Sequence, residues 1–329
     1  MRRMPTAFVT GGSGFIGGRL IRRLRDEGWD VRALARSSRS ADAVRELGAE
    51  PVQGDISEPG AMRSGADDCE YAFHAAAHVG DWGTRAEFER DNVEGTRNAL
   101  AACREAGVRR FVHVGTEAAL LAGQPLVNVD EDAPLRPDSP ALYPSTKAKA
   151  EHAVRDAGAG GFETVVIRPR FVWGPGDTTV LPSILDAVRG EQFRWIGGGH
   201  HRTSTTHVDN AVEGLWLGAT RGRAGGVYFV TDGEPVEFRS FVSDLLRTAG
   251  VEPPSGELPA PLARAGATAA EAAWHLLPLK GAPPVTRFSV WIASLECTID
   301  ITRAREELGY VPVVSRAEGL DALRSASAP

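Results

Sequence analysis

A tyrosine and a lysine four positions apart, Tyr143 and Lys147, are the residues in this sequence best suited to acid/base chemistry. Residues four apart share one face of a helix, so the phenol and the ammonium can meet the same ligand. A phenol can protonate the alkoxide formed when a ketone is reduced, but its ordinary pKa of about 10 makes it a poor base near neutrality. A neighbouring lysine charge lowers that pKa. The spacing therefore indicates an acid/base pair for carbonyl or alcohol chemistry.

A glycine-rich turn near the start of the chain is suited to holding the phosphates of a dinucleotide. Strand-like residues 6–10 lead into the run Gly11-Gly12-Ser13-Gly14-Phe15-Ile16-Gly17, and a helical pattern follows. Without side chains, such a turn lets backbone N–H groups reach a pyrophosphate, and the helix N-terminus adds a favourable potential. The run satisfies GxGxxG from Gly12 and the wider GxxGxxG from Gly11. An ordinary glycine-rich turn is the alternative interpretation.

The residues that follow the second strand bear on the choice of cofactor. NAD binding calls for an acidic residue about 20 positions past the turn, where it accepts a hydrogen bond from the ribose 2′-OH. Here that strand ends without an acid, and Asp30 precedes it. Arg36 and Ser37 instead offer a cation and a hydroxyl where a 2′-phosphate would lie. The sequence thus favours NADP, with NAD as the alternative.

Short apolar runs alternate with helical patterns through the first half of the chain. Strands are expected at 6–10, 31–35, 50–53, 71–75, 110–115 and 163–168, and helices at 14–27, 41–47, 86–106 and 143–157. This alternation predicts an α/β fold of Rossmann type, a doubly wound parallel sheet with helices on both faces. Residues 1–170 would form this dinucleotide-binding domain. Residues 171–329, richer in Pro and Gly, would form a smaller, irregular α+β substrate domain, with residues 227–230 a candidate to return to the main sheet.

These motifs together resemble the extended short-chain dehydrogenase/reductase family, and the resemblance spans nearly the whole chain. It implies that Thr116, after the fifth strand, is the catalytic hydroxyl beside Tyr143 and Lys147. Many relatives carry a Ser where this chain has Gly115, so one hydroxyl replaces the usual pair. Cofactor contacts are expected from Gly11, Gly14, Phe15, Ile16, Gly17, Arg36, Ser37, Asp55, Ile56, Ala75, Ala76, Ala77, Tyr143, Lys147 and Pro169.

The branch of the family is indicated by the later segments. Residues 78–83 and 300–312 are similar to the 3β-hydroxysteroid dehydrogenase branch, and aromatic residues favour a bulky apolar alcohol or ketone as substrate. Those aromatic residues are Phe171, Trp173, Phe193, Trp195, Trp274 and Trp291. A nucleotide-sugar epimerase, with Arg194 or Arg202 holding a diphosphate, is the alternative within enzymes. An NADP-binding sensor or scaffold is the alternative outside them.

The composition of the chain bears on whether it binds nucleic acids or membranes. Acidic residues outnumber basic ones 43 to 37, which gives no support to nucleic-acid binding. The apolar residues 259–279 contain Arg264, Glu271 and His275, so they suit a helix over a cleft, or contact with a membrane surface, rather than an integral membrane span.

The remaining expectations concern metals, compartment and assembly. Three widely spaced cysteines and no signal peptide at the basic N-terminus fit a cytoplasmic protein. His200, His201 and His207 lack the carboxylate or Cys partners of a metal site, so no metal is expected. The family resemblance implies a homodimer through helices 86–106 and 143–157, and a small-molecule substrate.

Overall fold

A seven-stranded parallel sheet is the centre of the molecule. The computed structural model describes residues 4–277 and 279–327. The strands follow the order β12-β7-β5-β4-β1-β2-β3. Their bounds are β1 Thr6–Thr10, β2 Asp30–Ala35, β3 Glu50–Gln53, β4 Tyr71–His74, β5 Arg110–Val114, β7 Glu163–Pro169 and β12 Gly226–Val230. This is the doubly wound, Rossmann-type sheet that the sequence predicts, with the strands close to their expected limits.

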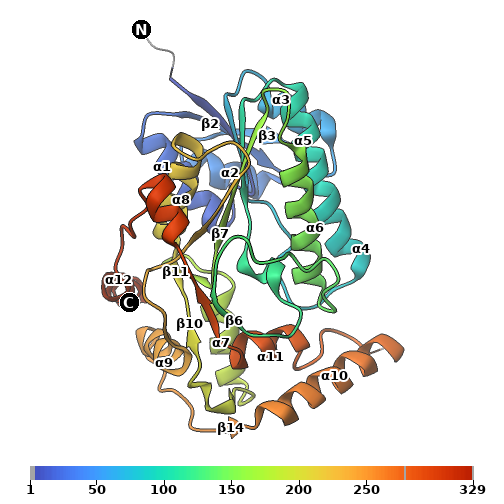
Figure 1. The fold of residues 1–329 in the computed structure, drawn as a ribbon, viewed down its shortest axis with the longest axis vertical. Helices are drawn as coiled ribbons and strands as arrows, with labels where there is room; N and C mark the ends of the chain where they lie inside the picture. The colour runs from blue at the N-terminus through green and yellow to red at the C-terminus, as the bar shows by residue number, and fades with distance from the viewer. Residues whose placement is uncertain (1–3, 278, 328–329) are drawn as a thin grey trace.

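Helices cover both faces of the sheet and create two cores (Figure 1). Because successive strand residues point to opposite faces, Ala7 and Val9 join one core while Phe8 joins the other. The first core lies under α1, α2 and α8, and the second under α3, α5 and α6. These helices span Phe15–Asp26, Ser38–Glu46, Val208–Thr220, Pro59–Ala66, Gly95–Glu105 and Leu142–Ala157.

Two helical regions differ from the sequence expectation. The expected helix 86–106 is divided into α4 (Arg85–Phe88), a π-helical stretch η1 (Glu89–Glu94) and α5. Helix α3 was not expected, because its glycines lower helix propensity. One of them, Gly65, is needed there, since a Cβ would lie 2.4 Å from the ring of Phe8.

A second lobe lies beyond the carboxyl edge of the sheet (Figure 1). Its four-stranded sheet follows the order β13-β10-β15-β6, and two two-stranded pairs, β11-β8 and β14-β9, accompany it. The strands are β6 Leu126–Val129, β8 Val172–Trp173, β9 Trp195–Ile196, β10 Arg202–Thr203, β11 Thr206–His207, β13 Val236–Glu237, β14 Glu257–Leu258 and β15 Cys297–Ile299. The helices are η2 Glu117–Leu120, α7 Val180–Arg189, η3 Gly197–Gly199, α9 Phe238–Thr248, α10 Ala260–Leu276, α11 Arg287–Ser294 and α12 Arg316–Ser327, whereas η4 (Ala304–Leu308) packs on the main sheet against α8 and β12.

The two lobes exchange strands. Strand β12 comes from the second half of the chain and pairs with β7 in the main sheet, while β6 comes from the first half and pairs with β15 in the small sheet. Glu131 adds a direct link, because its carboxylate accepts a hydrogen bond from the backbone N–H of Phe229 on β12 at 2.8 Å. The expected domains 1–170 and 171–329 include residues 1–3, 278 and 328–329, which lie outside the described residues.

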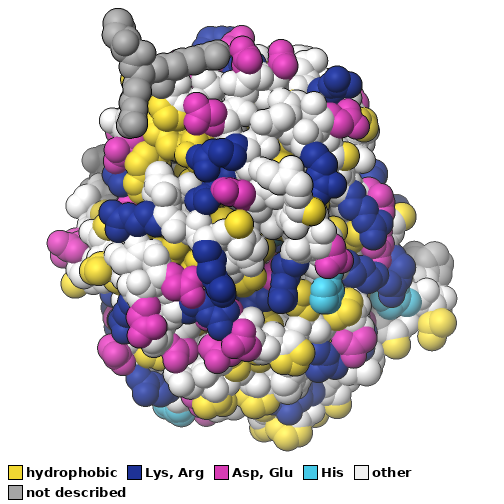
Figure 2. All heavy atoms as spheres, turned by 45° about the horizontal axis from the view of Figure 1, so that its top comes forward, with side chains coloured by type: hydrophobic (Ala, Val, Ile, Leu, Met, Phe, Trp, Pro, Cys, Tyr) yellow, Lys and Arg dark blue, Asp and Glu magenta, His cyan; other side chains and the backbone are white. Residues whose placement is uncertain are grey.

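The surface carries both signs of charge. Figure 2 shows Lys and Arg side chains interspersed with Asp and Glu over the face in view. Among the described residues, no helix combines the length and the apolar character needed to cross a membrane. Helix α10 nevertheless exposes large apolar side chains, with Leu262 60% and Leu276 83% exposed.

Candidate functional site

The glycine-rich turn joins β1 to α1 through unusually close backbone contacts. Gly11 has a φ of 73°, and its carbonyl accepts a hydrogen bond from the N–H of Gly14 at 3.0 Å. A Cβ on Gly17 would lie 2.1 Å from the Gly11 oxygen, so only glycine fits there. A Cβ on Gly11 would lie 2.6 Å from the Ala76 nitrogen. The turn therefore brings its backbone against the end of β4.

The turn has the features of a phosphate site. Gly14 is the N-cap of the 12-residue helix α1, and no side chain caps it. The first N–H groups of that helix, including those of Phe15 and Ile16, lack partners within the helix and carry its positive potential. A hollow of about 210 Å³ opens beside this end, lined by Ser13, Gly14, Phe15, Gly18, Arg19, Arg22, Leu47, Pro175, Gly176 and Thr178. These residues fit the diphosphate of a dinucleotide.

The other expected cofactor residues line the same edge of the sheet. Ala75, Ala76 and Ala77 follow β4 and are half-buried, and their small side chains leave room beside the turn. Asp55 follows β3, and its Oδ1 accepts hydrogen bonds from the backbone and hydroxyl of Ser57. The Ile56 side chain packs against the backbone of Gly95, where a Cβ would lie 2.7 Å from the Ile56 Cδ1 atom. Ligands of open α/β sheets bind at this edge.

Arg36 and Ser37 lie at the end of β2, as expected. Both are exposed, and the Ser37 hydroxyl caps α2 by accepting a hydrogen bond from the N–H of Ser40 at 3.2 Å. The structure thus leaves the Arg36 side chain accessible beside a helix N-terminus, a place where an anionic group is favoured.

Tyr143 and Thr116 come together at the end of β5. Tyr143 lies in the first turn of α6, and α6 packs against η2, the short helix that Thr116 caps. Burial, followed by the negative charge of Glu117, raises the pKa of Tyr143 above its ordinary range. The expectation that lysine lowers this pKa is therefore wrong.

Lys147 explains that difference, because its ammonium is turned toward β5. Its Nζ donates a hydrogen bond to the carbonyl of Val114 at 2.8 Å and lies 3.4 Å from Nε2 of His113. Burial lowers the pKa of Lys147 to about 8. Burial and the lysine charge hold the pKa of His113 well below its ordinary value, so this imidazole is a neutral acceptor.

A buried ion pair below Thr116 was not foreseen from the sequence. Arg170, directly after Pro169 at the end of β7, donates to Glu117 Oε1 at 2.9 Å. Glu117 Oε2 accepts the Thr116 hydroxyl at 2.9 Å. No sequence spacing indicates this pair, since its members are 53 positions apart.

Helix α11 covers the phenol from the second lobe. The ring of Phe288 lies 5.7 Å from that of Tyr143. The Thr286 hydroxyl donates to Asp81 Oδ2 at 2.8 Å, and Trp82 contacts His275 of α10 with 4.9 Å between ring centroids. Residues 78–83 therefore contact α10 and α11, and α11 covers the ring of Tyr143.

The tryptophans expected on the substrate side are mostly core residues. Trp173 and Trp195 are each 1% exposed and belong to the second lobe's cores, and Trp291 packs in the main core. The aromatic ring against Tyr143 is instead Phe288. Sequence alone could not single it out from the other aromatic residues.

The two arginines that would bind the diphosphate of a nucleotide sugar are hydrogen-bonded to backbone carbonyls instead. Arg194 donates to the carbonyls of Glu191 and Phe193, and Arg202 donates to that of Pro235. Both are exposed. His200 and His201 lie near Glu237 and Phe238, while His207 caps α8. Within the described residues, no group of three or more potential ligands is arranged to hold a metal.

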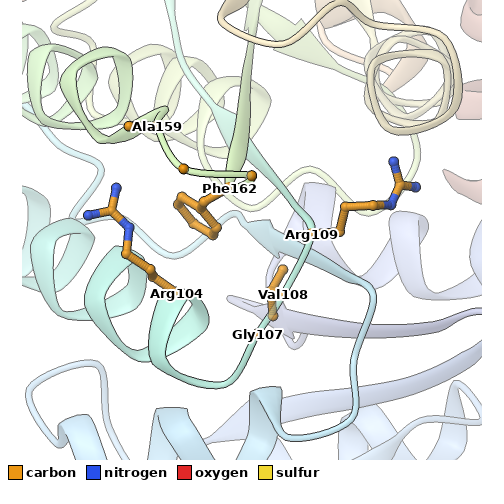
Figure 3. Close-up of a pocket in the computed structure, with 8 residues that line it drawn as sticks. Arg104, Gly107, Val108, Arg109, Ala159 and Phe162 are labelled. Atoms are coloured by element: carbon orange, nitrogen blue, oxygen red, sulfur yellow. The ribbon is translucent and has the colours of Figure 1, made fainter.

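A larger hollow of about 490 Å³ lies away from this site, between the ends of α5 and α6. Its lining is Arg104, Gly107, Val108, Arg109, Ala159, Gly160, Gly161 and Phe162. Figure 3 shows Arg104 beside Phe162 while the Arg109 side chain points away. The first arginine stacks on Phe162, and the second stacks on Tyr71 and pairs with Glu163. Both guanidinium groups already interact with other side chains of the protein, so neither arginine that lines the hollow is free to bind an anion.

Known proteins share both the sequence and the fold of this chain. A model of the 3-beta hydroxysteroid dehydrogenase/isomerase family matches residues 8–260. The chain is 47% identical over 319 residues to the 4-hydroxy-2-methyl-3-oxo-4-farnesyl-3,4-dihydroquinoline-1-oxide ketoreductase of Stigmatella aurantiaca, covering 97% of this chain and 96% of that protein. It is 36% identical over 332 residues to the 2-alkyl-3-oxoalkanoate reductase of Stenotrophomonas maltophilia, covering 97% and 98%.

A solved structure extends the likeness to the fold as a whole. MoeE5 in complex with UDP-glucose and NAD gives a TM-score of 0.74 at 24% identity, over 98% of both chains. At that identity the likeness concerns the fold alone.

Proposed function

The chain belongs to the 3-beta hydroxysteroid dehydrogenase/isomerase family, and from this premise we propose that it is an NAD(P)-dependent oxidoreductase that reduces a ketone on a bulky apolar molecule. One observation carries the proposal. Tyr143 and Thr116 lie on packed elements at the carboxyl edge of the sheet, the same edge at which β1 leads into the uncapped glycine-rich turn. Such an arrangement suits proton transfer beside a bound dinucleotide.

The proposed roles of the residues follow from their protonation states. A bound nicotinamide supplies the hydride. Tyr143 supplies the proton, because burial and the charge of Glu117 raise its pKa and keep the phenol protonated. Lys147 returns a proton to the phenol, since a pKa of about 8 leaves its ammonium ready to give one up near neutrality. A protonated phenol is an acid, and this favours reduction over oxidation.

The apolar cover supports the substrate class. Phe288 presents a ring to the phenol, and α10 rests on α11 through small residues, with Ala263 and Ala267 packed against Val290. The names of the two relatives describe reduction of ketones that carry a farnesyl or an alkyl chain. We therefore expect a ketone with a long or polycyclic apolar group.

For the cofactor we propose NADP rather than NAD, with Arg36 beside the 2′-phosphate. The support is an exposed cation at the end of β2 and the lack of an acid at the end of that strand. Arg36→Ala should raise the KM for NADPH by about tenfold and leave the KM for NADH unchanged. Arg45→Ala, on the exposed side of the neighbouring helix, is the matched control. Equal effects of Arg36→Ala on both cofactors would contradict this choice.

The remaining cofactor contacts are proposed in the positions described above. The turn residues Gly11, Gly14 and Gly17 would hold the diphosphate, Asp55 and Ile56 the adenine, and Pro169 the nicotinamide. Residues up to 170, with β12, would bind the cofactor, and most of 171–329 would bind substrate.

Two chains would associate through α5 and α6, which lie side by side (Figure 1), and light scattering would give the molar mass. The buried, unpaired thiols fit the cytoplasm.

The direct test is a substrate screen followed at the nicotinamide absorbance. Steroid, terpenoid, alkyl and aryl ketones are offered with NADPH and with NADH, and UDP-sugars are offered with NAD and assayed for epimerisation. Turnover of an apolar ketone supports the proposal. Epimerisation of a UDP-sugar without ketone turnover would favour the epimerase, and cofactor binding without any turnover would favour a sensor or scaffold.

A further inference from the structure

Three buried polar side chains form a row across the main sheet next to an apolar row. Thr10, His74 and His113 pair in register on β1, β4 and β5, and each is at most 2% exposed. Residues two apart in a strand point to the same face. The row two positions earlier belongs to the second core and consists of Phe8, Ala72 and Phe111. The polar row therefore faces the helices that cover this core, and the proposed reaction gives it no role.

His74, in the middle of the row, has its hydrogen bonds complete. Its Nδ1 lies 2.7 Å from the Thr10 hydroxyl, and its Nε2 lies 3.1 Å from the Thr96 hydroxyl. Burial, followed by the charge of Lys147, lowers the pKa of His74 to about 3, so the ring is neutral. Both ring nitrogens are occupied, and His74 has none left for the lysine.

His113 differs, because one ring nitrogen meets Lys147 and the other meets no polar group. Its Nε2 lies 3.4 Å from the lysine Nζ, and its ring stacks on His74 with 5.5 Å between centroids. Its Nδ1 is buried and has no hydrogen-bond partner among the described residues. The ring is neutral because burial and the lysine charge hold its pKa well below the ordinary value. An ammonium only donates, so Nε2 accepts and the ring proton lies on Nδ1.

The hydrogen bonds of the Lys147 ammonium can be counted. It has three N–H bonds. One goes to the carbonyl of Val114 at 2.8 Å, and a second goes to Nε2 of His113. The third has no acceptor in the part of the chain that the structure describes. Two acceptors from adjacent residues of β5 thus fix the position of Nζ and leave one N–H unused.

We propose that His113 is a positioning residue for Lys147, whose neutral imidazole holds one N–H of the ammonium against β5 so that a single N–H remains for the cofactor and the phenol. This inference deepens the proposed reductase function and rests on it. His113 does not relay protons, because a relay needs a hydrogen bond on each side of the ring and Nδ1 has none within the described residues.

The charged groups on the elements packed around α6 have other partners. Glu151, one turn further along this helix, raises the pKa of Lys147, and its carboxylate binds Arg168 of β7. The carboxylates of the neighbouring short helices are also paired, Glu117 of η2 with Arg170 and Glu89 of η1 with Lys149. The groups that touch the ammonium are therefore His113 and the carbonyl of Val114.

The test compares His113→Gln with His113→Asn. The Gln side chain is long enough to place an acceptor near the position of Nε2, whereas the Asn side chain reaches only the position of Nδ1. In His113→Asn the ammonium loses an acceptor, so the pKa of Lys147 falls further below its value of about 8. Lys147 returns a proton to the phenol only as an ammonium, so kcat for reduction is lost as pH rises through this pKa.

The basic limb of the kcat profile should therefore move down by about one pH unit in His113→Asn. At pH 8 this shift lowers kcat about fivefold, while the KM for the ketone should change less than about twofold. His113→Gln should restore most of the rate and of the profile. Lys149→Met, which removes a partly exposed lysine from the same helix, is the matched control and should leave the profile unmoved.

A second readout, nitrogen-15 NMR of the imidazole rings in cofactor-free protein, does not depend on turnover. The signals of His113 are identified by their absence from His113→Gln. At pH 7 we expect them to show a protonated Nδ1 and an unprotonated Nε2. Lys147→Met removes the donor to Nε2 and should shift these signals, whereas Lys149→Met should leave them in place.

Two results would overturn the proposal. One is a proton on Nε2 of His113 in the unmodified chain, and the other is a His113→Asn protein with an unchanged kcat profile. If His113→Asn fails to fold, the ring signals and their response to Lys147→Met decide the question. If the unmodified chain reduces no ketone, the proposed function fails, and the same signals still show whether His113 holds the lysine.

Discussion

At the scale of single residues, burial destabilises the charged form of both groups proposed for chemistry, the phenolate of Tyr143 and the ammonium of Lys147. Lys147 is 4% exposed, and burial lowers the pKa of its ammonium from 10.5 to about 8. The negative charge of Glu151 offsets this only in part. An ammonium that is destabilised in the folded protein gives up its proton more readily, which suits the proposed role of Lys147 as a proton donor. The same burial of the charged ammonium lowers the free energy of unfolding.

Lys147→Met should therefore stabilise the cofactor-free protein while abolishing turnover. The lysine pKa is lower in the folded than in the unfolded chain, so below pH 8 the folded state carries the full penalty, and the penalty disappears as pH rises from about 8 to 10.5. We expect the free energy of unfolding to rise by about 1–3 kcal/mol at pH 7 and by much less at pH 10. Denaturant titration at both pH values measures this.

The control for that measurement is Lys280→Met, an exposed lysine whose loss should change stability by less than about 0.5 kcal/mol. A Lys147→Met protein that is less stable than the unmodified chain at pH 7, or a difference that does not depend on pH, would contradict the account of this buried ammonium.

Some of these residues could be found from sequence and others could not. Tyr143 and Lys147 were predictable because four positions on one helix fix their relation. Glu117 and Arg170 were not, because only the three-dimensional path of β7 beside β5 brings them together. The direction of the Tyr143 pKa was also missed, since burial and a carboxylate outweigh a lysine that faces away.

At the scale of elements, α11 links the cover to the site. A capping box begins this helix: the Thr286 hydroxyl accepts the N–H of Ser289 at 3.0 Å while the Ser289 hydroxyl accepts the N–H of Thr286. The Thr286 hydroxyl also reaches Asp81. Thr286 thus begins the helix, joins it to residues 78–83 and sets the position of Phe288 over the phenol.

Thr286→Ala should loosen this cover. Loss of an N-cap lowers the free energy of unfolding by about 1 kcal/mol. Because Phe288 would no longer be held against Tyr143, we expect the KM for a bulky ketone to rise several-fold while kcat changes by less than about twofold. Thr268→Ala on α10, where the hydroxyl bonds only to its own helix, is the control. A kcat loss with KM unchanged would show that α11 does not contact the substrate.

The regular elements were more predictable than the irregular ones. Strand β1 matches its expected limits because a short buried apolar run, Ala7-Phe8-Val9, leads into the glycine-rich turn. Strand β3 is not a buried apolar run, but Gly48 and Gly54 mark its two ends. The two-residue strands of the second lobe, α7 and α11 were missed. The two-residue strands have too few residues for a periodic pattern, and they pair with partners far along the chain.

At the scale of the whole molecule, the two lobes are not separable segments. Strands β6 and β12 each lie in the sheet of the other half of the chain. Glu131 accepts from Phe229 and pairs with Arg303, so its buried carboxylate needs both halves. A fragment of residues 1–170 would expose the edge of β7 and leave that charge unpaired.

We expect the fragment 1–170 not to fold cooperatively, and the full chain to unfold in one transition. Calorimetry and circular dichroism of both proteins measure this. A fragment with a sharp transition of its own, at a temperature found also in the full chain, would show that the strand exchange contributes little to stability.

The central claim is that the phenol of Tyr143 gives the proton to the reduced ketone. The most direct measurement is the single-turnover rate of Tyr143→Phe with saturating NADPH and the best ketone from the screen, beside its cofactor affinity by fluorescence titration. We predict a rate at least about a thousandfold lower with cofactor affinity changed less than about threefold. A Tyr143→Phe protein that reduces the ketone at the unmodified rate would contradict the account.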